Sequence, residues 1–224
     1  MSAVVWFVLA GVALVAGVGL LSVDGRRRTA RTRARQDWAR ERGLRFTTAD
    51  PVITAQWSYG VFTRGGAGRA LDLAIGEHAG GVLSVLDLEQ RGTVVVTLVA
   101  RRRPTSSATA LELKLGSADA PTEAGTDLLG PVGPRYAFTS DLESARRAVD
   151  QRMVSLAEEV GDDVPVIWGE GAWALAALDP AATSARWDEV AAALVRFADL
   201  LRVLPPIETG PAGASSGPRM PHRA

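Results

Sequence analysis

The side chains that could do chemistry in this sequence are few, and its paired carboxylates come first. Asp87 and Glu89 lie two residues apart in a strand-like stretch, so their side chains share one face of the strand. Two carboxylates on one face could bind a metal ion or act as an acid and a base. They could equally form the solvent-exposed side of a sheet, and we favour this second interpretation. We therefore predict no catalytic residue and no metal ligand here.

Nucleophilic and metal-dependent chemistry lack their usual residues. The chain has no cysteine, which excludes disulfides, thiolate catalysis and cysteine zinc sites. Its two histidines are His78, in a glycine-rich turn, and His222, near the C-terminus. The run 65–68 lacks the Lys-Ser/Thr ending of a phosphate-binding loop and is interpreted as a hairpin turn. The sequence thus predicts a protein that is not an enzyme and that binds no cofactor. An enzyme working with carboxylates and arginines alone remains the alternative.

Three residues are candidates for binding a partner protein. Trp168 and Trp173 flank a Gly-Glu-Gly sequence, which predicts a hairpin that makes them cross-strand neighbours. Such tryptophans are core residues when buried and anchors for a partner when exposed. Arg135, between Pro134 and Tyr136, could pair with a carboxylate, although the sequence indicates no particular one.

The formal net charge of zero hides a strong division along the chain. Residues 26–45 contain nine arginines and two acidic residues, a net charge of +7. From residue 46 onward there are 16 basic and 22 acidic residues, a net charge of −6. The larger part of the chain is therefore acidic, and we predict no binding to nucleic acid.

The N-terminal segment predicts a membrane anchor. Residues 1–23 contain no charged side chain and are long enough to span about 30 Å of hydrocarbon. The arginines follow this segment instead of preceding it, which argues against a cleaved signal peptide. Arginine-rich flanks stay in the cytoplasm, so we predict a single-pass protein of the cell (inner) membrane with its N-terminus outside. Residues 46–206 would then form one cytoplasmic domain, and 207–224, rich in Pro, Gly and Ser, a disordered tail.

Residues 24–45 predict a basic juxtamembrane helix that continues from the anchor and ends near Gly43. The arginines in it could act as a topology signal alone. They could in addition bind the anionic lipids of the inner leaflet. The candidate membrane-surface residues are Arg26, Arg27, Arg28 and Arg31.

The rest of the chain predicts an α+β fold. Alternating or β-branched stretches at 70–76, 81–89, 92–100 and 110–115 predict four strands, with glycine-rich turns between the first three. The short links between consecutive strands favour a mainly antiparallel sheet. A short strand at 135–139 follows. A capping box at 140–143 predicts one helix that ends at Gly161, and a second helix begins near Thr183 or Ser184. These two helices of the C-terminal half are expected to pack on the sheet.

Four stretches carry a resemblance to a known family. They are 128–136 (LLGPVGPRY), 145–154 (ARRAVDQRMV), 168–175 (Trp168 through Trp173-Ala-Leu) and 200–206 (LLRVLPP). With the layout of one N-terminal span before an α+β domain, the chain resembles the actinobacterial, membrane-anchored family of trehalose monomycolate transport factors. The resemblance implies an accessory protein of cell-envelope lipid transport that acts beside a large polytopic transporter. It implies no catalytic residue.

Two classes of function follow for the soluble part. The first is a membrane-tethered adaptor, whose anchor raises its local concentration near an integral membrane partner such as a lipid transporter. The second is a lipid- or glycolipid-binding module at the inner face of the membrane, which requires an apolar cavity.

Overall fold

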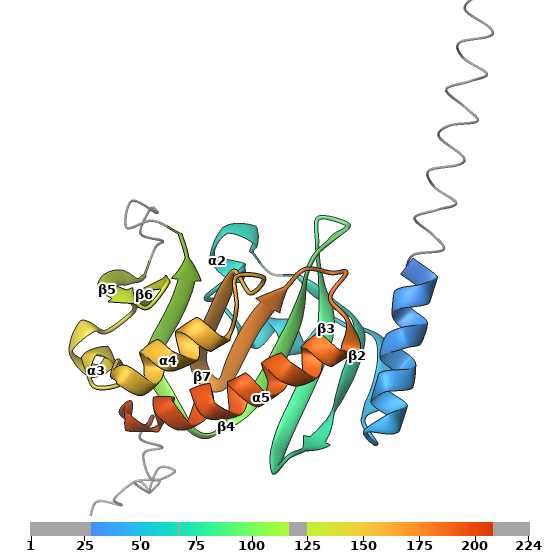
Figure 1. Ribbon diagram of the computed structural model, residues 1–224. Coiled ribbons are helices and arrows are strands. Elements are labelled where there is room, and N and C mark those ends of the chain that lie inside the picture. The colour runs from blue at the N-terminus through green and yellow to red at the C-terminus, as the bar shows by residue number, and fades with distance from the viewer. Residues whose placement is uncertain (1–27, 67, 117–124, 208–224) are drawn as a thin grey trace, which may run out of the picture.

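The strand-like stretches form one antiparallel sheet in the computed structural model, which describes residues 28–66, 68–116 and 125–207 (Figure 1). The sheet order is β1-β2-β3-β4-β6-β5, and β7 pairs with β4. The strands are β1 (Arg45–Asp50), β2 (Arg69–His78), β3 (Gly81–Gln90), β4 (Thr93–Leu115), β5 (Asp127–Val132), β6 (Arg135–Thr139) and β7 (Val166–Leu178). The expected α+β class and the mainly antiparallel sheet are confirmed.

The helical elements cover the two faces of this sheet unequally. They are η1 (Ile53–Gln56), α2 (Phe62–Gly65), α3 (Leu142–Arg146), α4 (Gln151–Glu159), α5 (Ser184–Leu200) and η2 (Leu201–Val203). A further helix, residues 28–41, precedes β1, and we call it the neck helix. One core cluster lies between the sheet and the neck helix, α4 and α5. A second, smaller cluster lies on the other face, under η1 and α2.

Two long strands replace four shorter elements that the sequence predicted. The stretches 92–100 and 110–115 belong to the single strand β4, and the predicted hairpin around Glu170-Gly171 is wrong because β7 runs through it. β4 and β7 pair along almost their whole length and change register together, where Ser107 lies opposite Gly171. Gly171 has φ +51°, which a glycine adopts without strain and which permits a bend in place of a turn.

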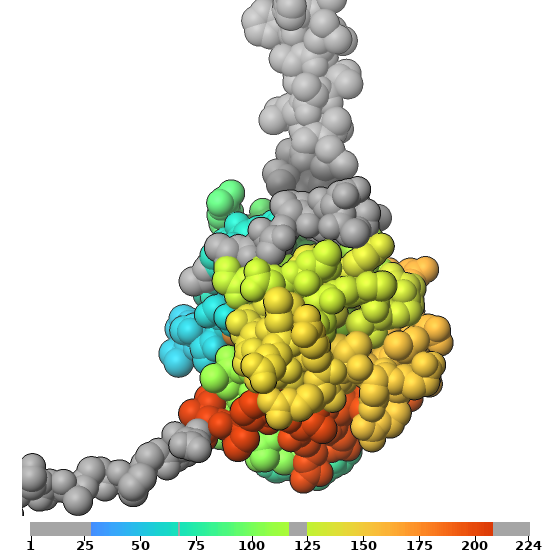
Figure 2. Space-filling model, turned by 90° about the vertical axis from the view of Figure 1, so that its left-hand side faces the viewer, coloured from blue at the N-terminus to red at the C-terminus, as the bar shows by residue number. Residues whose placement is uncertain are grey.

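The helix predicted from the capping box at residue 140 is also wrong in extent, because it is two helices. Asp141 caps α3 by accepting from the backbone N–H groups of Glu143 and Ser144. Asp150 caps α4 in the same way, accepting from Arg152 and Met153. A second N-cap inside the apolar repeat starts a new helix with its own axis. Figure 2 shows the surface that α3, α4, β5 and β6 form together.

The segment before β2 holds elements that the sequence analysis missed. β1, η1 and α2 were not anticipated, and the hairpin turn predicted at 65–68 is wrong because the helix α2, and not a strand, comes before β2. Gly66, at φ +69°, ends α2 instead. By contrast, α5 begins after Thr183 as predicted, and the hydroxyl of Thr183 accepts from the N–H of Arg186.

The predicted membrane span, residues 1–23, lies outside the described residues, as does the predicted tail apart from Ile207. Within the described ranges, no helix is long and apolar enough to cross a bilayer.

Candidate functional site

The neck helix is joined to the sheet by a buried ion pair. Arg35 is 2% exposed, and its guanidinium lies 2.7 Å from the carboxylate of Asp87 on β3. It also donates to the hydroxyl of Thr97, which in turn donates to Asp87 at 2.6 Å. One turn earlier, the hydroxyl of Thr32 donates to Asp72 on β2 at 2.7 Å. These contacts fix the helix along β2 and β3.

Aromatic packing completes this junction. Trp38 meets Trp187 of α5 edge to face, with 5.5 Å between the ring centroids. Its indole N–H donates to Asp188, which also accepts two hydrogen bonds from Arg42. The guanidinium of Arg35 lies over the Trp187 ring at 4.7 Å. The face that carries Thr32, Arg35, Trp38 and Arg42 thus belongs to the domain, not to a free tether.

The opposite face of the sheet carries two buried glutamates. Glu170 is 6% exposed and accepts from the backbone N–H groups of Ser58 and Tyr59 and from the indole of Trp168. Glu112 is fully buried and accepts from the N–H of Gly60. Together they hold the irregular segment between η1 and α2 against the sheet.

Gly60 is required in that segment. It has φ +65°, and a Cβ there would lie 2.6 Å from the Trp168 ring. The segment therefore approaches the sheet as closely as its backbone permits.

Burial changes the ionisation of these groups. It raises the pKa of Glu170 above its ordinary value, although the three N–H donors act in the other direction. Burial lowers the pKa of Arg103 to about 10, and it also lowers that of Arg135. A raised carboxyl pKa can mark a catalytic acid. Here, however, the carboxylates lie beneath residues 58–60 and are occupied by backbone donors, so they face no cleft.

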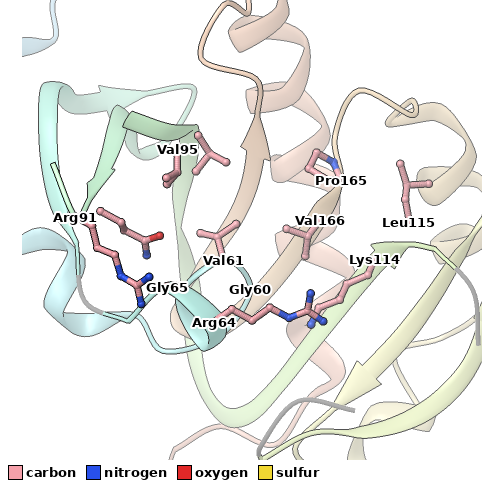
Figure 3. A pocket seen from close by; sticks show the side chains of 12 residues that line it. Gly60, Val61, Arg64, Gly65, Arg91, Val95, Lys114, Leu115, Pro165 and Val166 are labelled. Carbon is pink, nitrogen blue, oxygen red and sulfur yellow. The ribbon is translucent and has the colours of Figure 1, made fainter. Parts of the chain in front are cut away.

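A basic pocket lies beside this segment (Figure 3). It encloses about 560 Å³ between α2, the turn from β3 to β4, and the end of β4. Its three charged lining residues are all basic: Arg64, Arg91 and Lys114. The Lys114 ammonium lies 2.7 Å from Glu112, which links the pocket to the buried glutamates. Four valines, Leu115 and Pro165 form the apolar part of the lining, and Val95 among them is 40% exposed.

Comparison with known proteins identifies the family. The family model described as trehalose monomycolate transport factor TtfA matches residues 2–223. Trehalose monomycolate transport factor A of Mycolicibacterium smegmatis is 33% identical over 202 residues, which are 90% of this chain and 71% of that protein. This chain belongs to the TtfA family. The crystal structure of mycobacterial TtfA superimposes with a TM-score of 0.72 at 32% identity, covering 79% of this chain and 97% of that one.

The TtfA fold places the predicted partner-binding residues mostly inside. Trp168 has no exposed surface and packs in the smaller core cluster. Trp173 is partly buried, meets Trp57 at 5.6 Å and donates to Gln56. Arg135 is fully buried and pairs with no carboxylate directly. It donates instead to the carbonyl of Ala157 in the last turn of α4 and to those of Gly161 and Val164 in the loop that follows.

The structure describes two of the four predicted membrane-surface arginines, and it places Asp87 of the acidic pair in the interior. Arg26 and Arg27 lie outside the described residues, whereas Arg28 is exposed and Arg31 half-buried on the neck helix. The interpretation of Asp87 as part of a solvent-exposed face is wrong, because it is 4% exposed under Arg35. In the described ranges, no group of three His, Asp or Glu residues is arranged to hold a metal ion.

Sequence reasoning missed the two features that build the site. The neck face repeats at three- and four-residue steps (32, 35, 38 and 42), a helical pattern that was available in the sequence. Glu112 and Glu170 gave no such signal, since Glu112 is an isolated acid in a strand-like stretch and Glu170 lies in what was predicted as a hairpin turn.

Proposed function

We propose that this chain is a membrane-tethered, non-enzymatic accessory protein that supports the transport of trehalose monomycolate, or a related envelope lipid, by an integral membrane transporter. The observation that carries the proposal is its likeness to the Mycolicibacterium smegmatis transport factor over 90% of the chain. The family model also covers the N-terminal segment for which we expect a membrane span, because its match begins at residue 2.

The geometry supports a binding role over catalysis. The buried carboxylates of Asp87, Glu112 and Glu170 are engaged by Arg35 or by N–H donors, so they hold elements together. The docked neck helix gives an adaptor a fixed orientation. A span before it would confine the domain to the cytoplasmic membrane surface, with the N-terminus outside, and would raise its effective concentration near a membrane partner.

Complementation tests the role. This chain would be expressed in Mycolicibacterium smegmatis depleted of its own transport factor A, with radiolabelled trehalose monomycolate followed through the envelope. We expect the full chain to restore transport and a variant lacking residues 1–23 to fail. A variant with an unrelated single span in place of 1–23 is the matched control and should restore transport. Failure of the full chain would contradict the proposed role.

Cross-linking in intact membranes tests the partner. We expect the full chain to capture an integral membrane transporter, and the capture to need the tether. Equal capture by the variant without residues 1–23 would contradict the adaptor mechanism, because effective concentration would then be irrelevant.

A further inference from the structure

The neck helix begins at the same end of the molecule as the basic pocket. Thr32, in its second turn, contacts Asp72 near the start of β2, and Leu44, after its end, lies against Gly76 near the end of β2. The start of β2 pairs with the end of β3, where Arg69 lies opposite Glu89. The turn that follows leads into β4 and supplies Arg91. Figure 1 shows α2 and this turn at the end where the neck helix begins.

This placement sets the distance from the pocket end to a bilayer. Only residues 24–27 separate the expected span from the first residue of the neck helix that the structure describes. Four residues reach at most about 15 Å when extended and about 6 Å when helical. Because the neck helix is docked on the sheet, the same short distance separates the expected span from this end of the domain. The pocket end would therefore lie close to the headgroups.

The charge of the pocket suits an anionic surface. Its lining has three basic and no acidic residues, although residues 46–224 as a whole carry a net charge of −6. An acidic domain is repelled by an acidic leaflet except where basic residues face it. Val95 adds exposed apolar surface beside Arg91, which suits the junction between a headgroup and its acyl chains.

We propose that the pocket end of the domain lies on the membrane and that the pocket takes the anionic headgroup of an acidic phospholipid. Arg64 and Arg91 would bind the phosphate, and Val95 would contact the glycerol and upper acyl region. The occupant we infer is a bilayer lipid, because a tethered pocket meets headgroups at far higher local concentration than free anions. The inference rests on the tether in the proposed function and goes beyond it.

The absence of cysteine makes a site-specific test simple. Val95→Cys gives one thiol at the pocket, and Glu77→Cys gives one at the opposite end of β2, each for labelling with an environment-sensitive nitrobenzoxadiazole dye. The full chain is reconstituted in nanodiscs of phosphatidylcholine with an increasing share of phosphatidylglycerol. We expect phosphatidylglycerol to raise and blue-shift the emission at position 95 and to leave position 77 unchanged.

Charge variants test the role of the arginines. Arg64→Gln with Arg91→Gln should abolish the response at position 95, since each basic residue contributes about five-fold in affinity for an anionic surface. Arg102→Gln is the matched control, because Arg102 is exposed at the other end, and it should retain the response. Thermal unfolding of each variant checks that the fold is intact.

Three results would overturn the inference. The first is a response at position 95 that is equal in both lipids or that survives the double substitution. The second is loss of the response when millimolar inorganic phosphate is added, which would indicate a free-phosphate site. The third is a response that occurs in native membranes alone, which would assign the pocket to a protein partner.

Failure of this inference and failure of the proposed function can be told apart. If the dye at position 95 does not respond to phosphatidylglycerol but the chain still restores transport in Mycolicibacterium smegmatis, the lipid site alone is overturned. A chain that binds phosphatidylglycerol but restores nothing overturns the proposed role alone.

Discussion

The two faces of the sheet are held by groups of opposite charge. On the face covered by the neck helix, α4 and α5, buried arginines join the elements by donating to the carboxylate of Asp87, to carbonyls in and after α4, or to the carbonyl of Leu201 after α5. On the other face the joining groups are glutamates, which accept N–H groups from the segment between η1 and α2.

This difference explains which face of the sheet is covered by long helices and which face has a pocket at its edge. A guanidinium has five donors and can join the carbonyls at a helix end to the sheet, so long helices can be fixed in place. A carboxylate accepts from free backbone N–H groups, and on this face the irregular segment at residues 58–60 supplies them. The arginine face is therefore covered by long helices, and the glutamate face leaves a basic pocket at its edge.

The largest loss of stability is expected when the contact between the neck helix and β3 is broken. Arg35→Met should lower the free energy of unfolding by about 3–5 kcal/mol, because it leaves Asp87 buried without its partner. Arg35→Met with Asp87→Leu should recover much of that loss, since no unpaired charge then remains. Urea unfolding of the full chain in detergent measures both. A single substitution that costs no more than the double would contradict the buried-pair account.

The next largest loss of stability is expected when Arg135, which lies beneath α4, is replaced. Arg135→Met removes the donor to three buried carbonyls and should cost about 3 kcal/mol or more. Arg135→Lys keeps the charge but loses the planar fork, and it should recover part of the stability. Hydrogen exchange should show the loss concentrated in α4. Unchanged protection of α4 would show that Arg135 does not hold this helix.

A smaller loss of stability, one that depends on pH, is expected when Glu170 on the glutamate face is replaced. Glu170→Gln should cost about 1–3 kcal/mol, because the amide nitrogen would meet a backbone or indole donor. The folded-state pKa of Glu170 is raised above its ordinary value of 4.5, so the folded state binds this proton more tightly. The contribution of Glu170 to wild-type stability therefore falls as pH rises from 4.5 through the raised pKa.

The glutamine variant lacks that contribution. The difference in the free energy of unfolding between wild type and Glu170→Gln should thus decrease as pH rises through this window. A difference that is constant with pH would mean that Glu170 titrates alike in the folded and unfolded states.

The smallest effect is expected at the break between α3 and α4. Asp150→Ala removes the N-cap of α4 and should cost about 1 kcal/mol, and Asp150→Asn should retain most of the stability because the amide oxygen still caps. Thermal unfolding compares the two. Equal loss in both would indicate that the charge of Asp150, and not its capping oxygen, stabilises the helix.

Regular elements with a strong repeat could be predicted from the sequence, and bends could not. The apolar repeat and cap of α5 led directly to its start at Ser184. β4 and β7 were each divided at a polar or glycine-containing stretch, 101–109 and 169–171, that usually marks a turn. Only the pairing of the two strands turns these stretches into a shared bend, and pairing partners are not local information.

The site depended on tertiary pairing for the same reason. Asp87 and Arg35 are 52 residues apart in the chain. Local pattern assigns each to a solvent-exposed face, because charged residues are usually exposed unless a partner is known. Arg135 was a candidate for an interaction surface because the sequence indicated no partner for it, and Trp168 because it was predicted to flank a hairpin turn. The structure buries both, which agrees with the core alternative for Trp168.

The central claim is that the neck helix is fixed to the domain, so that with the proposed membrane span it would determine which end faces the membrane. Double electron–electron resonance, which measures the distance between two spin labels, tests this claim most directly. One label is attached at Gln36→Cys on the exposed side of the neck helix and the other at Ala192→Cys on the exposed side of α5, in the full chain in nanodiscs. We predict one narrow distance distribution, which broadens when Arg35→Met is added. A broad distribution in the unmodified background would show a free tether and contradict the account.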